Sequence, residues 1–271
     1  MFRKTARGGR LGSGAVRRTA AVVVAVCAAV GPVVAGCGGA GDGGDGAERL
    51  TVYAAASLRG PFTELGRRFE ADHPGLTVDL VFAGSADLVA QLTEGAVADV
   101  LATADTATMD RAGAAGLLET EPVDFATNVP TVVTAPGNPR GVGSFADLAR
   151  PDLQVVVCAP QVPCGVATAR LEELTGVRLR PVSEESSVTD VLNKVTTGQA
   201  DAGVVYATDA RAAGDRVTAV PVPQAAQVPV DYPIAVLTRA VHLDAAHAFV
   251  DLVTGPTGRR VLSAAGFGAP Q

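Results

Sequence analysis

Short apolar stretches rich in β-branched residues alternate with amphipathic stretches along most of this 271-residue chain. Strands are predicted at 51–54, 76–82, 98–103, 129–135, 153–158, 202–206, 217–222 and 231–237. Between and after these strands, apolar residues recur at helical spacing, as Phe62, Leu65 and Phe69 do. Strands that alternate with helices form parallel-rich sheets that bind ligands at the C-terminal ends of their strands. The chain is therefore predicted to be an α/β protein.

Two crossings divide the predicted elements into two lobes. The sequence PGNP at 136–139 breaks an apolar strand and marks the passage into a second lobe, and DYPIAVL at 231–237 returns to the first. Lobe I is predicted at 50–130 and 231–271, and lobe II at 131–230. Two α/β lobes joined by two crossings describe a hinged clamshell.

Residues 1–36 have the pattern of a targeting segment. Six basic residues and no acidic residue accompany an interrupted apolar run at 20–35, which is too short for a comfortable membrane span. The sequence VAGC at 34–37 resembles the lipobox of a bacterial lipoprotein signal peptide. That resemblance implies cleavage before Cys37 and a lipid on its sulfur, with an uncleaved anchor as the alternative. Either arrangement places the bulk of the chain outside the cytoplasm, at the outer face of the cell membrane.

Residues 37–49 are predicted to be the lipidated cysteine and a Gly-rich tether. Cleavage before Cys37 leaves 16 basic residues against 28 acidic ones, a formal charge of −12. A protein this acidic offers no electrostatic basis for binding nucleic acid. An anionic ligand must therefore be held by local dipoles rather than by the overall field of the protein.

Ser57 and Ser85 each stand between the end of a predicted strand and the start of a predicted helix, beside small residues. The first N–H groups of a helix have no intrahelical acceptor, and the helix dipole favours negative charge at that end. Serine is also a favoured N-cap, so a plain capping role is the alternative for each residue. The repetition of the arrangement favours an anion site.

Six further motifs occur in the order in which one known family has them. They are AAASL at 54–58, FAGSADLVAQL at 82–92, GAVADVLATAD at 95–105, VPCG at 162–165, VYATDA at 205–210 and DYPIAV at 231–236. From about residue 50 to the C-terminus, the chain resembles the molybdate-binding proteins of bacterial molybdate ABC importers. The resemblance implies a type II periplasmic-binding-protein fold, a two-lobed clamshell.

The resemblance also implies a ligand set of neutral donors for a tetrahedral oxyanion. Ser57 and Ser85 supply hydroxyl and backbone N–H groups, and Cys164 and Val188 supply backbone N–H groups. Tyr206 donates its phenol O–H, although a buried tyrosine with a satisfied hydroxyl is the alternative reading. Because a fully deprotonated oxyanion offers only acceptors, a site built only of donors selects it.

The chain departs from the family pattern at two positions. Cys164 stands where a small residue is usual, and Ala86 follows Ser85 where a further hydroxyl is frequent. Cys158 and Cys164 are the cysteines that remain after cleavage and lipidation, and in an oxidising location they are predicted to form a disulfide. Free thiols and an adventitious metal site are the alternatives. The disulfide fixes the loop that presents the Cys164 amide.

The predicted function is the capture of molybdate, and of tungstate with it, by a monomeric extracytoplasmic lipoprotein that delivers it to an ABC permease. No cofactor and no direct metal ligand are expected. A receptor for sulfate or thiosulfate is the alternative within this class, and an enzyme on the same fold is less favoured. Asp99 and Asp105 are candidates for acid–base work, but Asp99 is expected in a strand and Asp105 as a helix cap. The sequence contains no convincing activated nucleophile.

Overall fold

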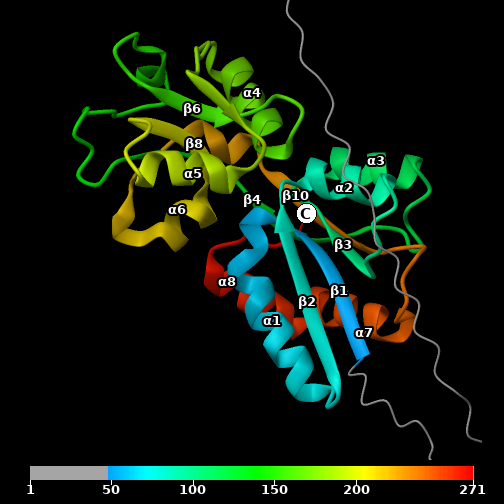
Figure 1. Ribbon diagram of the computed structural model, residues 1–271. Coiled ribbons are helices and arrows are strands. Elements are labelled where there is room, and N and C mark those ends of the chain that lie inside the picture. The colour runs from blue at the N-terminus through cyan, green and yellow to red at the C-terminus, as the bar shows by residue number, and fades with distance from the viewer. Residues whose placement is uncertain (1–47, 271) are drawn as a thin grey trace, which may run out of the picture. The chain divides into compact units, whose positions relative to one another are not determined.

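The computed structural model describes residues 48–270. The predicted signal peptide at 1–36, Cys37 and most of the predicted tether lie outside the described residues. Within them the chain forms two five-stranded sheets with helices packed around them (Figure 1). No helix in this part of the chain is long and apolar enough to cross a membrane. The α/β prediction is confirmed.

The first sheet has the strand order β2-β1-β3-β10-β4. Its strands are β1 (Glu48–Ala55), β2 (Leu76–Ala83), β3 (Val100–Ala102), β4 (Val123–Asn128) and β10 (Val230–Val236). The helices that follow these strands are α1 (Arg59–Asp72), α2 (Ser85–Thr93), α3 (Thr106–Ala114), α7 (Leu243–Thr254) and α8 (Pro256–Ala265). A short 3₁₀ helix, η1 (Ala56–Leu58), connects β1 to α1.

The second sheet has the order β7-β6-β8-β5-β9. Its strands are β5 (Pro130–Thr134), β6 (Val155–Cys158), β7 (Ser183–Glu185), β8 (Ala202–Tyr206) and β9 (Thr218–Val220). Its helices are α4 (Pro163–Thr175), α5 (Val188–Thr196) and α6 (Ala207–Ala213), with the 3₁₀ helices η2 (Ala146–Ala149), η3 (Gly214–Arg216) and η4 (Pro223–Gln227).

The chain passes between the sheets twice. Val129 alone separates β4 of the first sheet from β5 of the second, and β10 (orange in Figure 1) brings the chain back among the early strands. Strands β5 and β10 run antiparallel to the strands beside them. In contrast, β1 pairs in parallel with β2 and β3 in the first sheet, and β6 pairs in parallel with β7 and β8 in the second. The sheets are therefore mixed rather than parallel-rich, because β5 and β10 enter from the other sheet and not through a helical crossover. The passage into the second sheet therefore lies at Val129, before β5, and not at residues 136–139 as predicted. The exact lobe limits stay a prediction.

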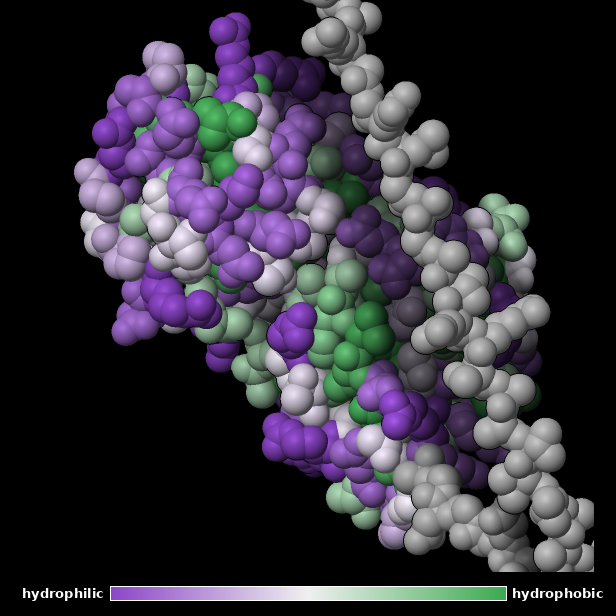
Figure 2. Space-filling model, in the orientation of Figure 1, coloured by the Kyte–Doolittle hydropathy of each residue, from purple (hydrophilic) through white to green (hydrophobic). Residues whose placement is uncertain are grey.

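The predicted apolar face of α1 lies in the core. Phe62, Leu65 and Phe69 are at most 1% exposed, and the rings of Phe62 and Phe69 pack edge-on against Phe249 of α7 at 6.0 and 5.4 Å. Most of the surface in view is hydrophilic, with apolar residues gathered near its centre (Figure 2). The packing of α1 and α7 on the first sheet holds the loop after β1 in place, and this loop carries Ser57.

Candidate functional site

All five predicted oxyanion-binding residues line one cavity. The cavity contains about 240 Å³ of space not filled by protein atoms, part of it open to solvent. One wall comes from loops of the first sheet, and the other comes from the first turns of α4 and α5 and the end of β8. None of the lining residues, all of which lie within residues 48–270, carries a formal charge. An anion in this cavity meets N–H and O–H groups rather than lysine or arginine.

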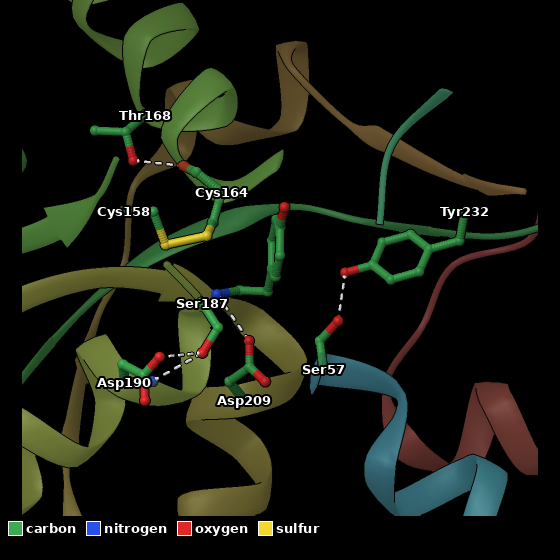
Figure 3. Close-up of a disulfide and its surroundings, with 9 residues drawn as sticks. Ser57, Cys158, Cys164, Thr168, Ser187, Asp190, Asp209 and Tyr232 are labelled. Atoms are coloured by element: carbon green, nitrogen blue, oxygen red, sulfur yellow. Dashed lines mark hydrogen bonds between the residues drawn. A yellow bond between two sulfur atoms is a disulfide. The ribbon is translucent and has the colours of Figure 1, made fainter. Parts of the chain in front are cut away.

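Ser57 lies in η1 and does not cap α1, because that helix begins two residues later with Leu58 as its N-cap and no side-chain cap. The capping interpretation of Ser57 is therefore wrong. Its hydroxyl instead lies 3.0 Å from the hydroxyl of Tyr232 on β10, and the two side chains point toward one another (Figure 3). Because Ser57 lies in this 3₁₀ turn before α1, its hydroxyl does not bond to an N–H group of the helix.

Ser85 is the first residue of α2, and Gly84 is the N-cap, so Ser85 is not a cap either. The Ser85 side chain is 2% exposed, and its oxygen accepts a hydrogen bond of 3.1 Å from the backbone N–H of Ala104. Because an amide N–H only donates, the Ser85 oxygen must accept there. The Ser85 O–H remains available to donate.

The second wall presents backbone N–H groups from two helix starts. Cys164 lies in the first turn of α4 beside Pro163, and Val188 is the first residue of α5. N–H groups in a first turn have no intrahelical acceptor. Ser187 caps α5, because its hydroxyl oxygen accepts from the Asp190 N–H. Both helix starts therefore direct donors and the positive end of a dipole at the cavity.

Cys158 and Cys164 form a disulfide, with their Cα atoms 5.6 Å apart, as predicted. The bond joins the end of β6 to the first turn of α4 (Figure 3). Gly165 packs against the same loop so closely that a Cβ at this position would lie 1.9 Å from the carbonyl oxygen of Ala159. The loop that presents the Cys164 N–H is held by a covalent bond and by close packing.

Tyr206 ends β8 and is 1% exposed. Its hydroxyl is buried and has no hydrogen-bond partner among residues 48–270, so the reading of a satisfied core tyrosine is wrong. Burial, together with the neighbouring Tyr232, Asp105 and Asp209, raises the pKa of the Tyr206 phenol well above its ordinary value. Tyr206 therefore keeps its proton and presents an unpaired donor in the cavity wall.

Asp209 supports Tyr206 from the first turn of α6. Its carboxylate accepts a 3.2 Å hydrogen bond from the backbone N–H of Tyr206 (Figure 3). The Asp209 side chain is buried, and this burial raises the pKa of its carboxyl from 3.8 to about 7. Near neutral pH, Asp209 exists in both the neutral and the charged form.

The two other carboxylates of interest have structural roles. Asp105 caps α3 by accepting a 2.9 Å hydrogen bond from the Thr108 N–H, as predicted. Asp99 lies one residue before β3 rather than in a strand. Its carboxylate accepts backbone N–H groups from Thr51 at 2.7 Å and Val241 at 2.6 Å, which ties β1 to the segment after β10. These bonds leave neither group as an evident acid–base catalyst.

Two residues at the site were missed by sequence reasoning. Tyr232 appeared only within a motif, and Asn128 was not considered. The Tyr232 hydroxyl lies against that of Ser57, and the Asn128 amide lies against the Tyr232 hydroxyl. The signal for Tyr232 was an aromatic residue inside an otherwise apolar return strand. Asn128 gave no comparable signal, because its strand β4 was not predicted.

The fold and the site define the class of solute-binding proteins that capture a small ligand between two α/β sheets. Residues 50–268 match the family described as bacterial extracellular solute-binding protein, and the chain belongs to this family. This membership confirms the prediction of a binding protein rather than an enzyme.

Particular relatives agree with the predicted resemblance. The chain is 55% identical over 225 residues to the molybdate-binding protein ModA of Mycobacterium tuberculosis. This alignment covers 83% of this chain and 86% of the relative. The predicted resemblance to molybdate-binding proteins is thereby confirmed.

Among solved structures, the periplasmic molybdate-binding protein of Azotobacter vinelandii aligns with a TM-score of 0.70 at 21% identity, over 82% of this chain and all of that one. The sulfate-binding protein SubI of Mycobacterium tuberculosis aligns with a TM-score of 0.67 at 22% identity, over 81% of this chain and 86% of that protein. At these identities the likeness shows the fold alone, and it confirms the prediction of a periplasmic-binding-protein fold.

Proposed function

We propose that this chain binds molybdate in the cavity between its two sheets, with Ser57, Ser85, Cys164, Val188 and Tyr206 as the donors. The observation that carries the proposal is the Tyr206 hydroxyl, a buried donor without a protein partner in the wall of that cavity. Buried donors are almost always paired, so a ligand acceptor is the natural partner. The 55% identity to a mycobacterial molybdate-binding protein supports this choice of ligand.

Tungstate is proposed as a second ligand, because it presents the same tetrahedral set of acceptor oxygens. Sulfate makes the same demand on the donors, so discrimination against it rests on the size of the cavity. A sulfate or thiosulfate receptor is the second candidate, and the fold likeness to a sulfate-binding protein is the observation that favours it.

The proposed role in the cell is delivery of the oxyanion to the permease of an ABC importer at the outer face of the membrane. Cys37 is proposed to carry the lipid that holds the chain there, with residues 38–49 as the tether. Replacing the sulfur by an oxygen tests the anchor. By mass spectrometry the parent protein should carry the mass of a lipid on Cys37, and a Cys37→Ser variant should lack it. A parent protein without that mass would contradict lipid anchoring at this residue.

Calorimetric titration tests the ligand assignment. The full chain, purified in detergent, is titrated in turn with molybdate, tungstate, sulfate and phosphate. The proposal expects one-to-one binding of molybdate and tungstate, with sulfate far weaker. Tight binding of sulfate would instead support the second candidate, a sulfate receptor. If none of the four anions bound, the proposal of an oxyanion site in this cavity would be wrong.

A further inference from the structure

The hydroxyl of Tyr232 is buried directly behind Ser57. Tyr232 is 0% exposed, and its hydroxyl has two hydrogen-bond partners among the described residues: the Ser57 hydroxyl at 3.0 Å and the Asn128 side-chain nitrogen at 3.4 Å. Its ring packs edge-on against Phe125, Phe267 and Tyr206, which holds the hydroxyl in position. The direction of these two hydrogen bonds decides what the Ser57 hydroxyl can offer to a ligand.

The Asn128 amide has one possible orientation. Its side-chain oxygen lies 3.0 Å from the backbone N–H of Val129, and because an N–H only donates, the acceptor atom of the amide must be there. The amide nitrogen therefore faces the Thr208 hydroxyl at 2.7 Å and the Tyr232 hydroxyl. Thr208 lies in α6, so this contact also ties β4 to the second sheet. With both Asn128 and Thr208 4% exposed, the arrangement is shielded from water.

The remaining directions follow from this one. The Asn128 nitrogen can only donate, so Tyr232 accepts from it and must send its own hydrogen elsewhere. Ser57 is the only acceptor within its reach among residues 48–270. The reverse direction, with Ser57 donating to Tyr232, would leave a fully buried phenol hydrogen unpaired, which buried groups avoid.

We propose that Asn128 and Tyr232 form a relay that fixes the Ser57 hydroxyl as a donor toward the cavity and thereby excludes oxyanions that carry a proton. The proposal rests on the proposed function of the cavity. The oxygen of Ser57 accepts from Tyr232, so its hydrogen is directed at the ligand. The backbone N–H of Ala104 orients Ser85 in the same way. A hydrogen phosphate must donate its own O–H, whereas a serine whose O–H is directed at the ligand presents a donor there rather than an acceptor.

Tyr232→Phe is the test of the relay. The variant keeps the ring and its edge-on contacts but removes the donor to Ser57, so the serine hydroxyl becomes free to rotate. We expect molybdate affinity to fall roughly threefold to tenfold, the effect of one neutral hydrogen bond. The variant is compared with the parent protein by calorimetry on the full chain, with thermal unfolding to establish that it is folded.

The same substitution in two further backgrounds separates a positioning role from general disturbance of the site. In Ser57→Ala the relay has no hydroxyl to orient, so adding Tyr232→Phe should change molybdate affinity less than twofold. In Ser85→Ala, the matched control, adding Tyr232→Phe should still cost the full threefold to tenfold. Equal losses in all three backgrounds would overturn the relay.

A competition experiment tests the selectivity. At mildly alkaline pH, phosphate retains one proton and molybdate has none. In Tyr232→Phe we expect phosphate to displace molybdate at a lower concentration ratio than in the parent protein. A variant that excludes phosphate as strictly as the parent does would overturn the claim about selectivity. Failure of the parent protein to bind molybdate at all would instead refute the proposed function, so the two failures are distinguishable.

Discussion

Tyr206 is the residue on which the proposed ligand contact depends most, because its hydroxyl has no other use in the described structure. Tyr206→Phe should lower molybdate affinity by about 1.5–3 kcal/mol, the contribution of a hydrogen bond to a charged group. The unfolding free energy of the ligand-free protein should not fall, since the hydroxyl makes no hydrogen bond within residues 48–270. Titration calorimetry and denaturant unfolding measure the two quantities.

Tyr53→Phe serves as the matched control. Tyr53 is 8% exposed in the core of the first sheet and does not line the cavity. Its substitution should leave molybdate affinity unchanged. Unchanged affinity in Tyr206→Phe as well would remove Tyr206 from the ligand set.

Asp209 makes stability depend on pH in a predictable direction. Its pKa is raised from 3.8 to about 7 in the folded protein, so between these values the native state holds the proton more tightly than the unfolded chain. The contribution of this group to stability is fully favourable below about pH 4, and is lost as the pH rises through 7. Asp209→Asn keeps an oxygen for the Tyr206 N–H and removes the titration.

The difference in Tm between Asp209→Asn and the parent protein isolates this group, because all other titrations are common to both. The variant should gain stability relative to the parent as the pH rises from about 4 to about 8. A Tm difference that is constant over this range would show that Asp209 does not titrate as its burial requires.

At the scale of elements, the disulfide between β6 and α4 positions one of the proposed donors. Replacing both Cys158 and Cys164 by serine should cost about 2 kcal/mol of stability for so short a loop. It should also weaken molybdate binding, because the Cys164 N–H is no longer held against the cavity. A reducing agent should lower the Tm of the parent protein and leave that of the variant unchanged. Equal sensitivity of both proteins would contradict the assignment.

Elements with strong local patterns were predictable from the sequence, and elements defined by distant partners were not. The helices at α1, α5, α7 and α8 have apolar residues at helical spacing, and β2 and β8 are apolar stretches. By contrast, β4 and β7 contain polar residues, VDFATN and SEE, and become strands because β10 and β6 pair with them. Both were missed.

The candidate site divides in the same way. Ser57 and Ser85 were indicated by their place between strand and helix, and the full set of five came from the family resemblance. All five line a single cavity, although their role in binding stays a prediction. The contact between Ser57 and Tyr232 joins residues 175 positions apart, and that between Asn128 and Tyr232 joins residues 104 apart. No local pattern contains such pairings, so the relay required the structure.

At the scale of the whole molecule, the two walls of the cavity meet at Gly84. A Cβ at this position would lie 2.4 Å from the carbonyl oxygen of Ser186 on the opposite wall. The backbone at Gly84, with φ −58° and ψ 137°, accommodates alanine, so the obstacle is the approach of the other wall. Gly84→Ala should therefore push the two walls apart and lower molybdate affinity on the order of tenfold or more.

Gly60→Ala is the control for that substitution, because no atom lies within 4 Å of a Cβ at this position in α1. It should leave affinity unchanged. The rise in Tm on adding molybdate measures binding in all three proteins. An equal rise in Gly84→Ala and the parent protein would mean that the two walls do not need to approach this closely.

A crystal structure of the molybdate complex, with the metal located by its anomalous scattering, is the most direct measurement of the proposed site. We predict a single anomalous peak in the cavity, with oxyanion oxygens about 2.7–3.2 Å from the Tyr206 hydroxyl and the Ser57 and Ser85 hydroxyls. A peak at any other place on the protein, or a peak in the cavity with the Tyr206 hydroxyl out of reach, would contradict the proposed site.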